Sequence, residues 1–306
     1  MINALGAAFR IFVLTLFLLV YSNAQSSAGG GLTKIADNVY AYVDVKNAEP
    51  SNSYGANAGI VIGKEGVLVV DTLISAKEAK RFIADIRTIT DKPIKYVVNT
   101  HYHLDHTFGN GEFAKLGAVI IAHERDKKSF ELHGAHVLKN IGNYGLSEAD
   151  MAGTTLAYPK LTFSDRAEID LGDERVELIA AGASHTDGSI LVSVHNRKIV
   201  FAGDVLFTGY HPYMAEGDIN GWVAALDMLG KMEATTIIPG HGPISNAKDL
   251  TEMKEYIVLF DREAKRFAME TGDVDDIYSR LKTLLPARSE GDWLIRANIR
   301  MRYVKK

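Results

Sequence analysis

Short apolar runs bounded by glycine or other turn residues recur along the first half of the chain. Runs of this kind predict strands, and they lie at residues 39–45, 59–62, 66–70, 94–98 and 118–122. Between them, residues 75–89 carry apolar positions at helical spacing behind Ser75, which predicts a helix with an N-terminal cap. Strands that alternate with helices indicate a layered α/β sheet with functional residues at strand ends.

The second half of the chain repeats this order of strands followed by helices. Strands are predicted at residues 166–171, 176–180, 189–194, 198–202 and 235–238, and helices at 218–232, 247–270, 273–285 and 292–303. Each half also holds a strand that ends in aspartate, at Asp71 and at Asp204. These patterns predict two halves packed sheet against sheet, with helices outside and a cleft along one edge.

Residues 34–306 are expected to form a single domain, of which residues 246–306 supply C-terminal helices. Residues 124–160 interrupt the strand pattern with a helical and loop-like stretch. Two interpretations of this insertion stay open: it covers a site as a lid, or it is a surface helix that only packs against the sheet.

The N-terminus has the pattern of a secretory signal peptide. Arg10 precedes the apolar run 11–21, and Ser22-Asn23-Ala24 provides small residues for cleavage after residue 24. The eleven-residue run is shorter than the ~20 apolar residues that span a bilayer. Residues 1–24 are therefore expected to be a signal peptide and residues 25–33 a flexible leader. The protein is expected in the periplasm or outside the cell, without stable membrane association after cleavage; a retained anchor is the alternative.

Composition narrows the chemistry. The chain has no cysteine, which excludes disulfides, thiolate metal ligands and a cysteine nucleophile. Its formal net charge of −4 becomes −5 without the signal peptide, whose only charge is that of Arg10. A chain with this negative net charge has no positive electrostatic field that would attract nucleic acid. A small-molecule substrate is the expected partner.

The stretch Thr100–His106 directly follows the predicted strand 94–98. It contains three histidines and an aspartate: His101, His103, Asp105 and His106. Imidazole and carboxylate together suit zinc or another borderline divalent metal. Single histidines usually have structural roles, but a dense cluster of this kind is typical of a metal site. Three later residues lie at predicted strand ends, in segments that contain glycine: His185, Asp204 and His241.

The ordered motifs HxHxDH, GxxHT, GD and PGHG resemble those of the metallo-β-lactamase superfamily. The resemblance implies a four-layer αββα fold and two divalent metal ions, with zinc as the expected metal. His101, His103 and His185 would hold one ion, Asp105, His106 and His241 the other, and Asp204 would bridge them. A hydroxide shared by the ions would attack an ester, thioester, lactone or amide-type carbonyl, and Asp105 would orient it and transfer its proton. Asp71 and Thr100 are candidates for supporting the histidine loop or, equally, for capping strand ends.

Two residues differ from those of one β-lactamase branch of the superfamily. Asp204 stands where one β-lactamase branch has a cysteine ligand, and Phe207 stands where that branch has a lysine for the β-lactam carboxylate. The chain is therefore more similar to the branches with a bridging aspartate, which are glyoxalase II-like and lactonase-like. Loop residues near the motifs are candidates for contacts with the substrate: Tyr102, Tyr210, His211 and Tyr213.

Three alternative functions stay open. One is weak β-lactamase activity. A second is an oxidoreductase related to the persulfide dioxygenases, which use a single iron and fewer of these ligands. The third is a periplasmic metal-binding accessory protein without catalytic activity.

Overall fold

The computed structural model describes residues 31–304, so the predicted signal peptide and most of the predicted leader lie outside the described residues. The first strand begins at Thr33, which is the last residue of the predicted leader. No helix of the described part is long and apolar enough to cross a bilayer.

The first half forms a seven-stranded sheet in chain order. β1 to β4 pair antiparallel and β4 to β7 pair parallel. Its strands are β1 (Thr33–Ala36), β2 (Val39–Tyr42), β3 (Ala58–Gly63), β4 (Gly66–Val70), β5 (Ile94–Val98), β6 (Val119–His123) and β7 (Leu161–Phe163).

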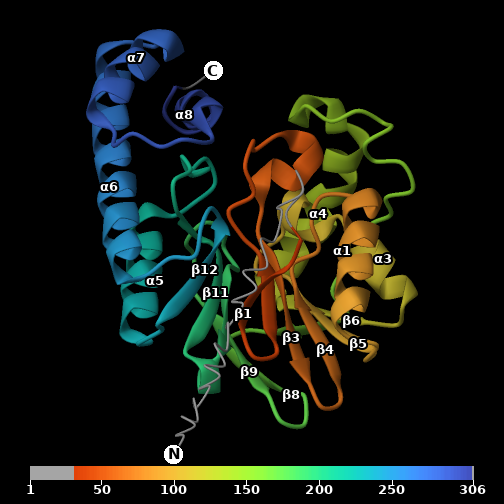
Figure 1. The fold of residues 1–306 in the computed structure, drawn as a ribbon. Helices are drawn as coiled ribbons and strands as arrows, with labels where there is room; N and C mark the ends of the chain where they lie inside the picture. The colour runs from red at the N-terminus through yellow and green to blue at the C-terminus, as the bar shows by residue number, and fades with distance from the viewer. Residues whose placement is uncertain (1–30, 305–306) are drawn as a thin grey trace, which may run out of the picture.

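The second half forms a five-stranded sheet of order β12-β11-β10-β9-β8, in which only β11 and β12 pair parallel. Its strands are β8 (Arg166–Asp170), β9 (Arg175–Ala180), β10 (Ile190–Val194), β11 (Ile199–Phe207) and β12 (Thr236–His241). The two sheets face each other (Figure 1).

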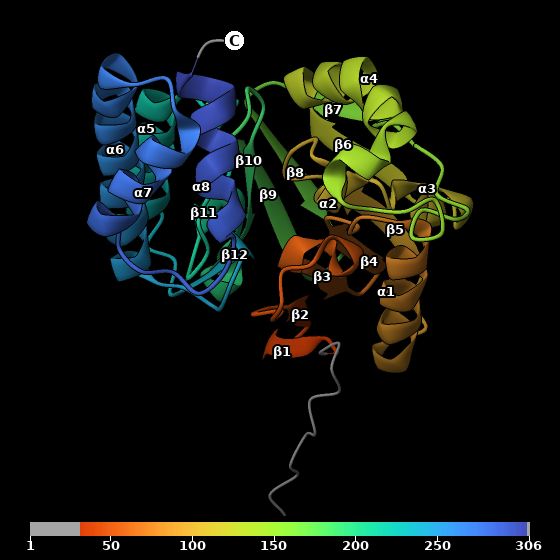
Figure 2. The same ribbon diagram turned by 90° about the horizontal axis from the view of Figure 1, so that it is seen from above.

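Helices cover the outer face of each sheet, which confirms the predicted αββα sandwich (Figure 2). One helical layer holds α1 (Ala76–Ile89), α3 (Asn110–Lys115) and α4 (Glu124–Lys139). The other holds α5 (Ile219–Lys231), α6 (Ala247–Glu270), α7 (Val274–Leu284) and α8 (Asp292–Asn298). The short α2 (Leu104–Thr107) carries part of the histidine motif.

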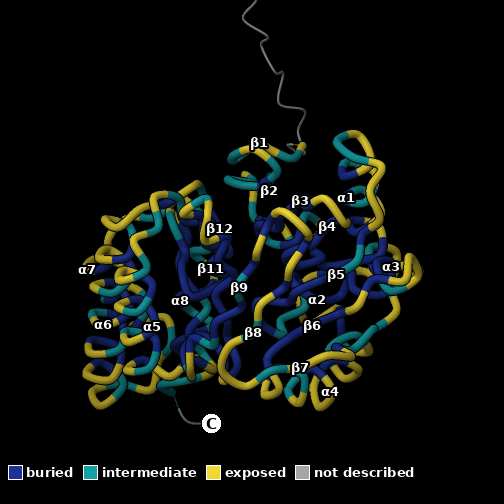
Figure 3. The backbone as a smooth tube through the Cα atoms, turned by 90° about the horizontal axis from the view of Figure 1, so that it is seen from below, coloured by how far each residue is buried: buried dark blue, intermediate teal, exposed yellow. Residues whose placement is uncertain are grey.

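Alternation along the strands explains the four layers. In β4, Leu68 and Val70 belong to the core between the sheets, whereas Val67 and Val69 pack with Phe82 of α1 on the outer face. Successive side chains of a strand point to opposite faces, so a strand buried on both sides reads as a continuous apolar run. Figure 3 shows that both sheets are buried along most of their length.

Two strands extend further than their sequence pattern predicts. β11 continues through Phe207, so that Asp204 lies inside the strand rather than after it. β12 likewise continues to His241. The reason is their parallel pairing, which resumes at Gly203 and at Phe207 after two irregularities in register.

The predicted insertion 124–160 holds α4 and the 3-10 helix η2 (Ile141–Tyr144). The carbonyl of Tyr144 accepts a hydrogen bond from the hydroxyl of Tyr54, which lies in the 3-10 helix η1 (Pro50–Gly55). The insertion therefore packs on a loop beside the predicted site, and its role as a lid stays a prediction.

Candidate metal centre

The seven predicted ligands lie at one edge of the sandwich. The connection after β5 supplies His101 and His103, and α2 supplies Asp105 and His106. The β9–β10 connection, β11 and β12 supply the other three, His185, Asp204 and His241. Ligand atoms within each of two groups all lie within 4.8 Å of one another: His101, His103, His185 and Asp204 form one group, and Asp105, His106 and His241 form the other.

The first group has the spacing of a metal's ligand shell. Nε2 of His185 lies 2.9 Å from Nδ1 of His103 and 3.3 Å from Oδ2 of Asp204. Nε2 of His101 lies 3.7 Å from the same Oδ2. Four ligands bound tetrahedrally at zinc–ligand distances stand about 3.4 Å apart, so one ion fits between these atoms.

The second group meets the first through Asp204. Oδ2 of Asp105 lies 3.4 Å from Nε2 of His106 and 3.4 Å from Nε2 of His241. Oδ1 of Asp204 lies 3.2 Å and 3.5 Å from the same two nitrogens. One oxygen of Asp204 thus faces each group, which is the arrangement of a carboxylate that bridges two ions.

Several of these converging atoms have no hydrogen-bond partner. They include Nε2 of His101, Nε2 of His106 and Oδ1 of Asp204, all of which are buried. Buried polar atoms are nearly always paired, and two divalent cations, one in each group, would satisfy all three. A set of imidazole nitrogens and carboxylate oxygens fits zinc, so the residues present suit the metals that the sequence predicts.

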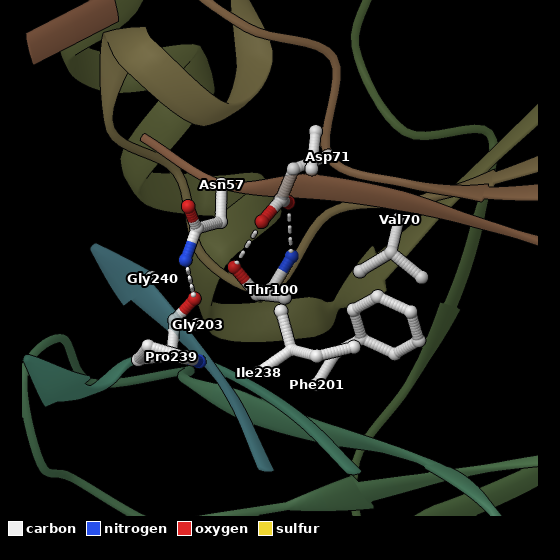
Figure 4. Close-up of a pocket in the computed structure, with 10 residues that line it drawn as sticks. Asn57, Val70, Asp71, Thr100, Phe201, Gly203, Ile238, Pro239 and Gly240 are labelled. Atoms are coloured by element: carbon white, nitrogen blue, oxygen red, sulfur yellow. Dashed lines mark hydrogen bonds between the residues drawn. The ribbon is translucent and has the colours of Figure 1, made fainter. Parts of the chain in front are cut away.

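The carboxylate of Asp71 contacts the histidine loop at Thr100 and at His106. Its Oδ1 accepts a hydrogen bond from the backbone N–H of Thr100, 2.8 Å away, and its Oδ2 accepts one from the Thr100 hydroxyl, 2.7 Å away (Figure 4). The same Oδ2 lies 2.9 Å from Nδ1 of His106. Asp71 has a φ of 59°, a left-handed conformation that costs energy for a non-glycine residue. Burial raises the pKa of its carboxyl, although His106 and Thr100 act in the opposite direction.

Asn57 holds the loop of His241 in a similar way. Its side-chain amide donates to the carbonyl of Pro239, 2.8 Å away (Figure 4), and to that of Gly242, 2.9 Å away. Nδ1 of His241 lies 3.2 Å from the carbonyl oxygen of Tyr54. These contacts hold the backbone on both sides of His241 and the Nδ1 edge of its ring, which leaves Nε2 directed at the ligand group.

Glu216 is a residue of the candidate site that the sequence motifs do not predict. Its Oε2 lies 3.3 Å from Nε2 of His103 and accepts a hydrogen bond from the hydroxyl of Tyr102. Its Oε1 lies 3.5 Å from the hydroxyl of Tyr213. Carboxylates commonly orient metal-binding histidines in this manner. Nothing in the local sequence distinguishes Glu216, because it reaches His103 only through the folding of the loop before α5.

The four substrate candidates separate into two pairs. The rings of Tyr102 and Tyr213 lie 4.7 Å and 5.5 Å from that of His103. The ring of Tyr210 lies 5.5 Å from that of His241, but its hydroxyl donates to the carbonyl of Val45. His211 is buried, and its Nδ1 lies 2.6 Å from the hydroxyl of Tyr256. The structure thus brings Tyr102 and Tyr213 to the centre and directs His211 into the helical layer.

Protons compete unevenly with metal at His185 and at His241. Burial and neighbouring imidazoles lower the pKa of His185 to about 3, although Asp204 opposes them, so this ring is neutral and able to bind metal at pH 7. Burial also lowers the pKa of His241, but Asp204 and Asp105 outweigh it and raise the value to about 9. A proton and a metal ion therefore compete for Nε2 of His241 at neutral pH.

A family model of the metallo-beta-lactamase superfamily matches residues 53–241. The linear primary-alkylsulfatase of a Pseudomonas species is 29% identical over 222 residues, which cover 62% of this chain and 42% of that protein. The α subunit of the 2,4-dinitroanisole O-demethylase of a Nocardioides species is 26% identical over 182 residues, 58% of this chain and 50% of that one. The chain thus spans half or less of the length of these two relatives.

Solved structures show the same fold. A metallo-β-lactamase from Pontibacter korlensis has a TM-score of 0.60 at 21% identity, over 74% of this chain and 98% of that one. The metallo-β-lactamase FIM-1 of Pseudomonas aeruginosa, solved in a mono-zinc form, has a TM-score of 0.57 at 19% identity, over 74% of this chain and 94% of that one. The family model covers more than half of the 306 residues and includes all seven predicted ligands. The chain therefore belongs to the metallo-β-lactamase superfamily.

Proposed function

We propose that this protein is a metal-dependent hydrolase that cleaves an ester, thioester, lactone or amide-type carbonyl with two divalent ions, zinc by preference. The observation that carries this proposal is the placement of Asp204, whose two oxygens face two separate groups of ligands. His101, His103 and His185 would hold one ion, and Asp105, His106 and His241 the other. When bound, such a pair of ions activates water near neutral pH and polarises the bond to be cleaved.

Asp105 is the residue assigned to proton transfer. Its Oδ2 faces His106 and His241, whereas its Oδ1 takes part in none of the hydrogen bonds among the described residues. That second oxygen is available to orient the attacking water and to accept its proton, which is the work of a general base.

Phe207 supports a substrate other than a β-lactam. Its ring is buried and stacks on that of His241, with centroids 5.0 Å apart and an interplanar angle of 2°. An apolar ring here offers no charge to a β-lactam carboxylate. Sulfate-ester hydrolysis is the second candidate function, because the alkylsulfatase is among the relatives. We also propose export to the periplasm or the medium, supported by Arg10 and the apolar run 11–21.

The test is one preparation of the protein, with its metal content measured and its activity assayed on ester, thioester, lactone, β-lactam and alkyl sulfate substrates. Asp105→Asn should reduce the rate on the hydrolysed class by ~10²–10⁴-fold. Asp91→Asn, in an exposed loop, is the control with the same change of charge. Hydrolysis of no class by the zinc-loaded protein would overturn the proposal, and a single iron per chain would favour the oxidoreductase alternative.

A further inference from the structure

The exposure of the ligands shows from which side a substrate reaches the centre. The side chains of His103 and Asp105 are 14% and 10% exposed, whereas none of the other five ligands exceeds 6%. Solvent, and therefore a substrate, meets the centre beside His103 and Asp105. The side chains around these two residues decide which molecules can approach.

We call these surrounding side chains the rim. Tyr102 and Tyr213 flank the ring of His103. Tyr54 follows on the side of His241, and its ring lies 5.8 Å from that of Trp293, which is 51% exposed. The rim consists of four aromatic residues and one acid: Tyr54, Tyr102, Tyr213, Trp293 and Glu216. Its surface is thus aromatic, and the hydroxyls of Tyr54 and Tyr102 donate to Tyr144 and Glu216 within the protein.

Glu216 is the only ionic member of the rim, and its side chain is 43% exposed. Within residues 31–304, no lysine or arginine forms an ion pair or side-chain hydrogen bond with Glu216 or with the seven ligands. The guanidinium of Arg302 contacts the backbone on either side of Glu216, but it donates to the carbonyls of Met214 and Gly217. The approach to the centre therefore carries negative charge without a paired cation.

With Glu216 included, the charges at the centre and its approach would sum to zero. Two divalent ions would bring four positive charges. Four carboxylates stand against them: Asp105 and Asp204 in the ligand set, Asp71 at His106 and Glu216 at His103. A substrate that carries its own negative charge would gain no long-range attraction from such a centre, and Glu216 is the most solvent-exposed of the four carboxylates.

We propose that the rim selects uncharged or cationic substrates with an aromatic group and rejects anionic ones, and that Glu216 sets this charge preference. The inference rests on the proposed hydrolase function and narrows its substrate class. Stacking on Tyr213, Tyr54 and Trp293 would hold the aromatic group, and a cationic substituent would gain further from the faces of these rings. The inference separates this chain from the sulfatase candidate, whose substrates are anions.

Three acetate esters of similar shape test the charge preference: phenyl acetate, 4-acetoxybenzoate and (4-acetoxyphenyl)trimethylammonium. Each kcat/KM of the zinc-loaded full chain is divided by the ester's rate of alkaline hydrolysis, which removes differences in intrinsic reactivity. We expect the anionic ester to be at least ~tenfold poorer than the neutral one, as for one unit charge at a partly exposed site. Glu216→Gln should narrow this ratio to within about threefold, because it removes the charge and keeps the shape.

The ratio between esters is unaffected by a general loss of activity or of folded protein, so a purely structural effect of Glu216→Gln would leave it unchanged. Glu252→Gln, at an exposed position of α6, removes the same charge elsewhere and should leave the ratio at its original value. Trp293→Ala should lower kcat/KM for phenyl acetate several-fold more than for methyl acetate. Met269→Ala, which truncates an exposed apolar side chain of α6, is its control.

The outcomes separate the two proposals. Hydrolysis of none of the esters or of the wider substrate panel would overturn the hydrolase function itself. Hydrolysis of 4-acetoxybenzoate or of dodecyl sulfate as efficiently as of a neutral ester would leave that function standing and overturn the charge preference. An unchanged ratio in Glu216→Gln would show that Glu216 does not set the charge preference.

Discussion

Oδ2 of Asp71 lies 2.9 Å from Nδ1 of His106, so the aspartate that ends β4 orients a ring whose Nε2 belongs to the ligand group. Both side chains are buried. The contact links the first sheet to the candidate metal centre and fixes which nitrogen of His106 is left for metal.

Asp71→Asn should therefore weaken metal binding at the second group by ~10–100-fold, since an amide supports the ring less well than a carboxylate. Competition titration with a coloured chelator measures the affinity. Asp37→Asn, in an exposed turn, provides a control with the same loss of charge. Equal zinc affinities for Asp71→Asn and the unaltered protein would contradict the assigned role.

Variants that lack the side chain of Asp204 or of His241 should retain different numbers of metal ions. Asp204→Ala deletes both oxygens of the proposed bridge, so we expect it to lose both ions after desalting. His241→Ala deletes a ligand of the second group alone and should retain one. Metal analysis by mass spectrometry gives the stoichiometry, and circular dichroism checks the fold. Loss of both ions from His241→Ala would show that the two groups do not bind independently.

Gly240 leaves the space that Asp204 occupies. A Cβ atom at position 240 would lie 1.9 Å from Oδ1 of Asp204 and 2.8 Å from its backbone nitrogen. Gly240→Ala should displace the carboxylate and lower both metal content and hydrolysis at least tenfold. In Gly230→Ala, on α5, the added atom would meet its nearest neighbour at 3.8 Å, so this variant should keep its metals and its rate. A fully active Gly240→Ala protein would refute the bridging geometry.

The buried carboxyl of Asp126 should make the stability of the protein depend on pH. It lies in the first turn of α4, is buried, and accepts a hydrogen bond from the hydroxyl of Thr186, 3.0 Å away. Burial raises its pKa to about 7, above the ~3.9 expected in the unfolded chain. Between these values the folded protein binds more protons than the unfolded one. Its contribution to stability is therefore full below pH ~4 and is lost as the pH rises towards 7.

Asp126→Asn should flatten this dependence. Between pH 4 and 8, in the presence of a chelator, the free energy of unfolding of the unaltered protein should fall relative to that of the variant by roughly 2–4 kcal/mol. Urea denaturation at several pH values measures the difference. Asp165→Asn, at an exposed position, should follow the unaltered protein. Parallel curves for Asp126→Asn and the unaltered protein would exclude a proton on this carboxyl.

The apolar pattern was sufficient to predict the layers. Continuous apolar runs such as 66–70 predict strands buried on both faces, and β4 indeed contributes to a core on each side. The pattern was less informative about strand ends: β11 extends to Phe207 through Gly203 and Asp204. Pairing with β12 extends it, and a pairing between distant segments is not visible in the local sequence.

The sequence by itself determined the family, the sandwich and a set of seven metal-ligand candidates, because the apolar runs and the ordered histidine and aspartate motifs are local features of the chain. The tertiary structure alone decided what surrounds them. It placed one oxygen of Asp204 toward each group, brought Glu216 to His103, and turned His211 toward Tyr256. These relationships join residues of separate segments, and they depend on how the sheets and loops pack, which no local pattern of residues specifies.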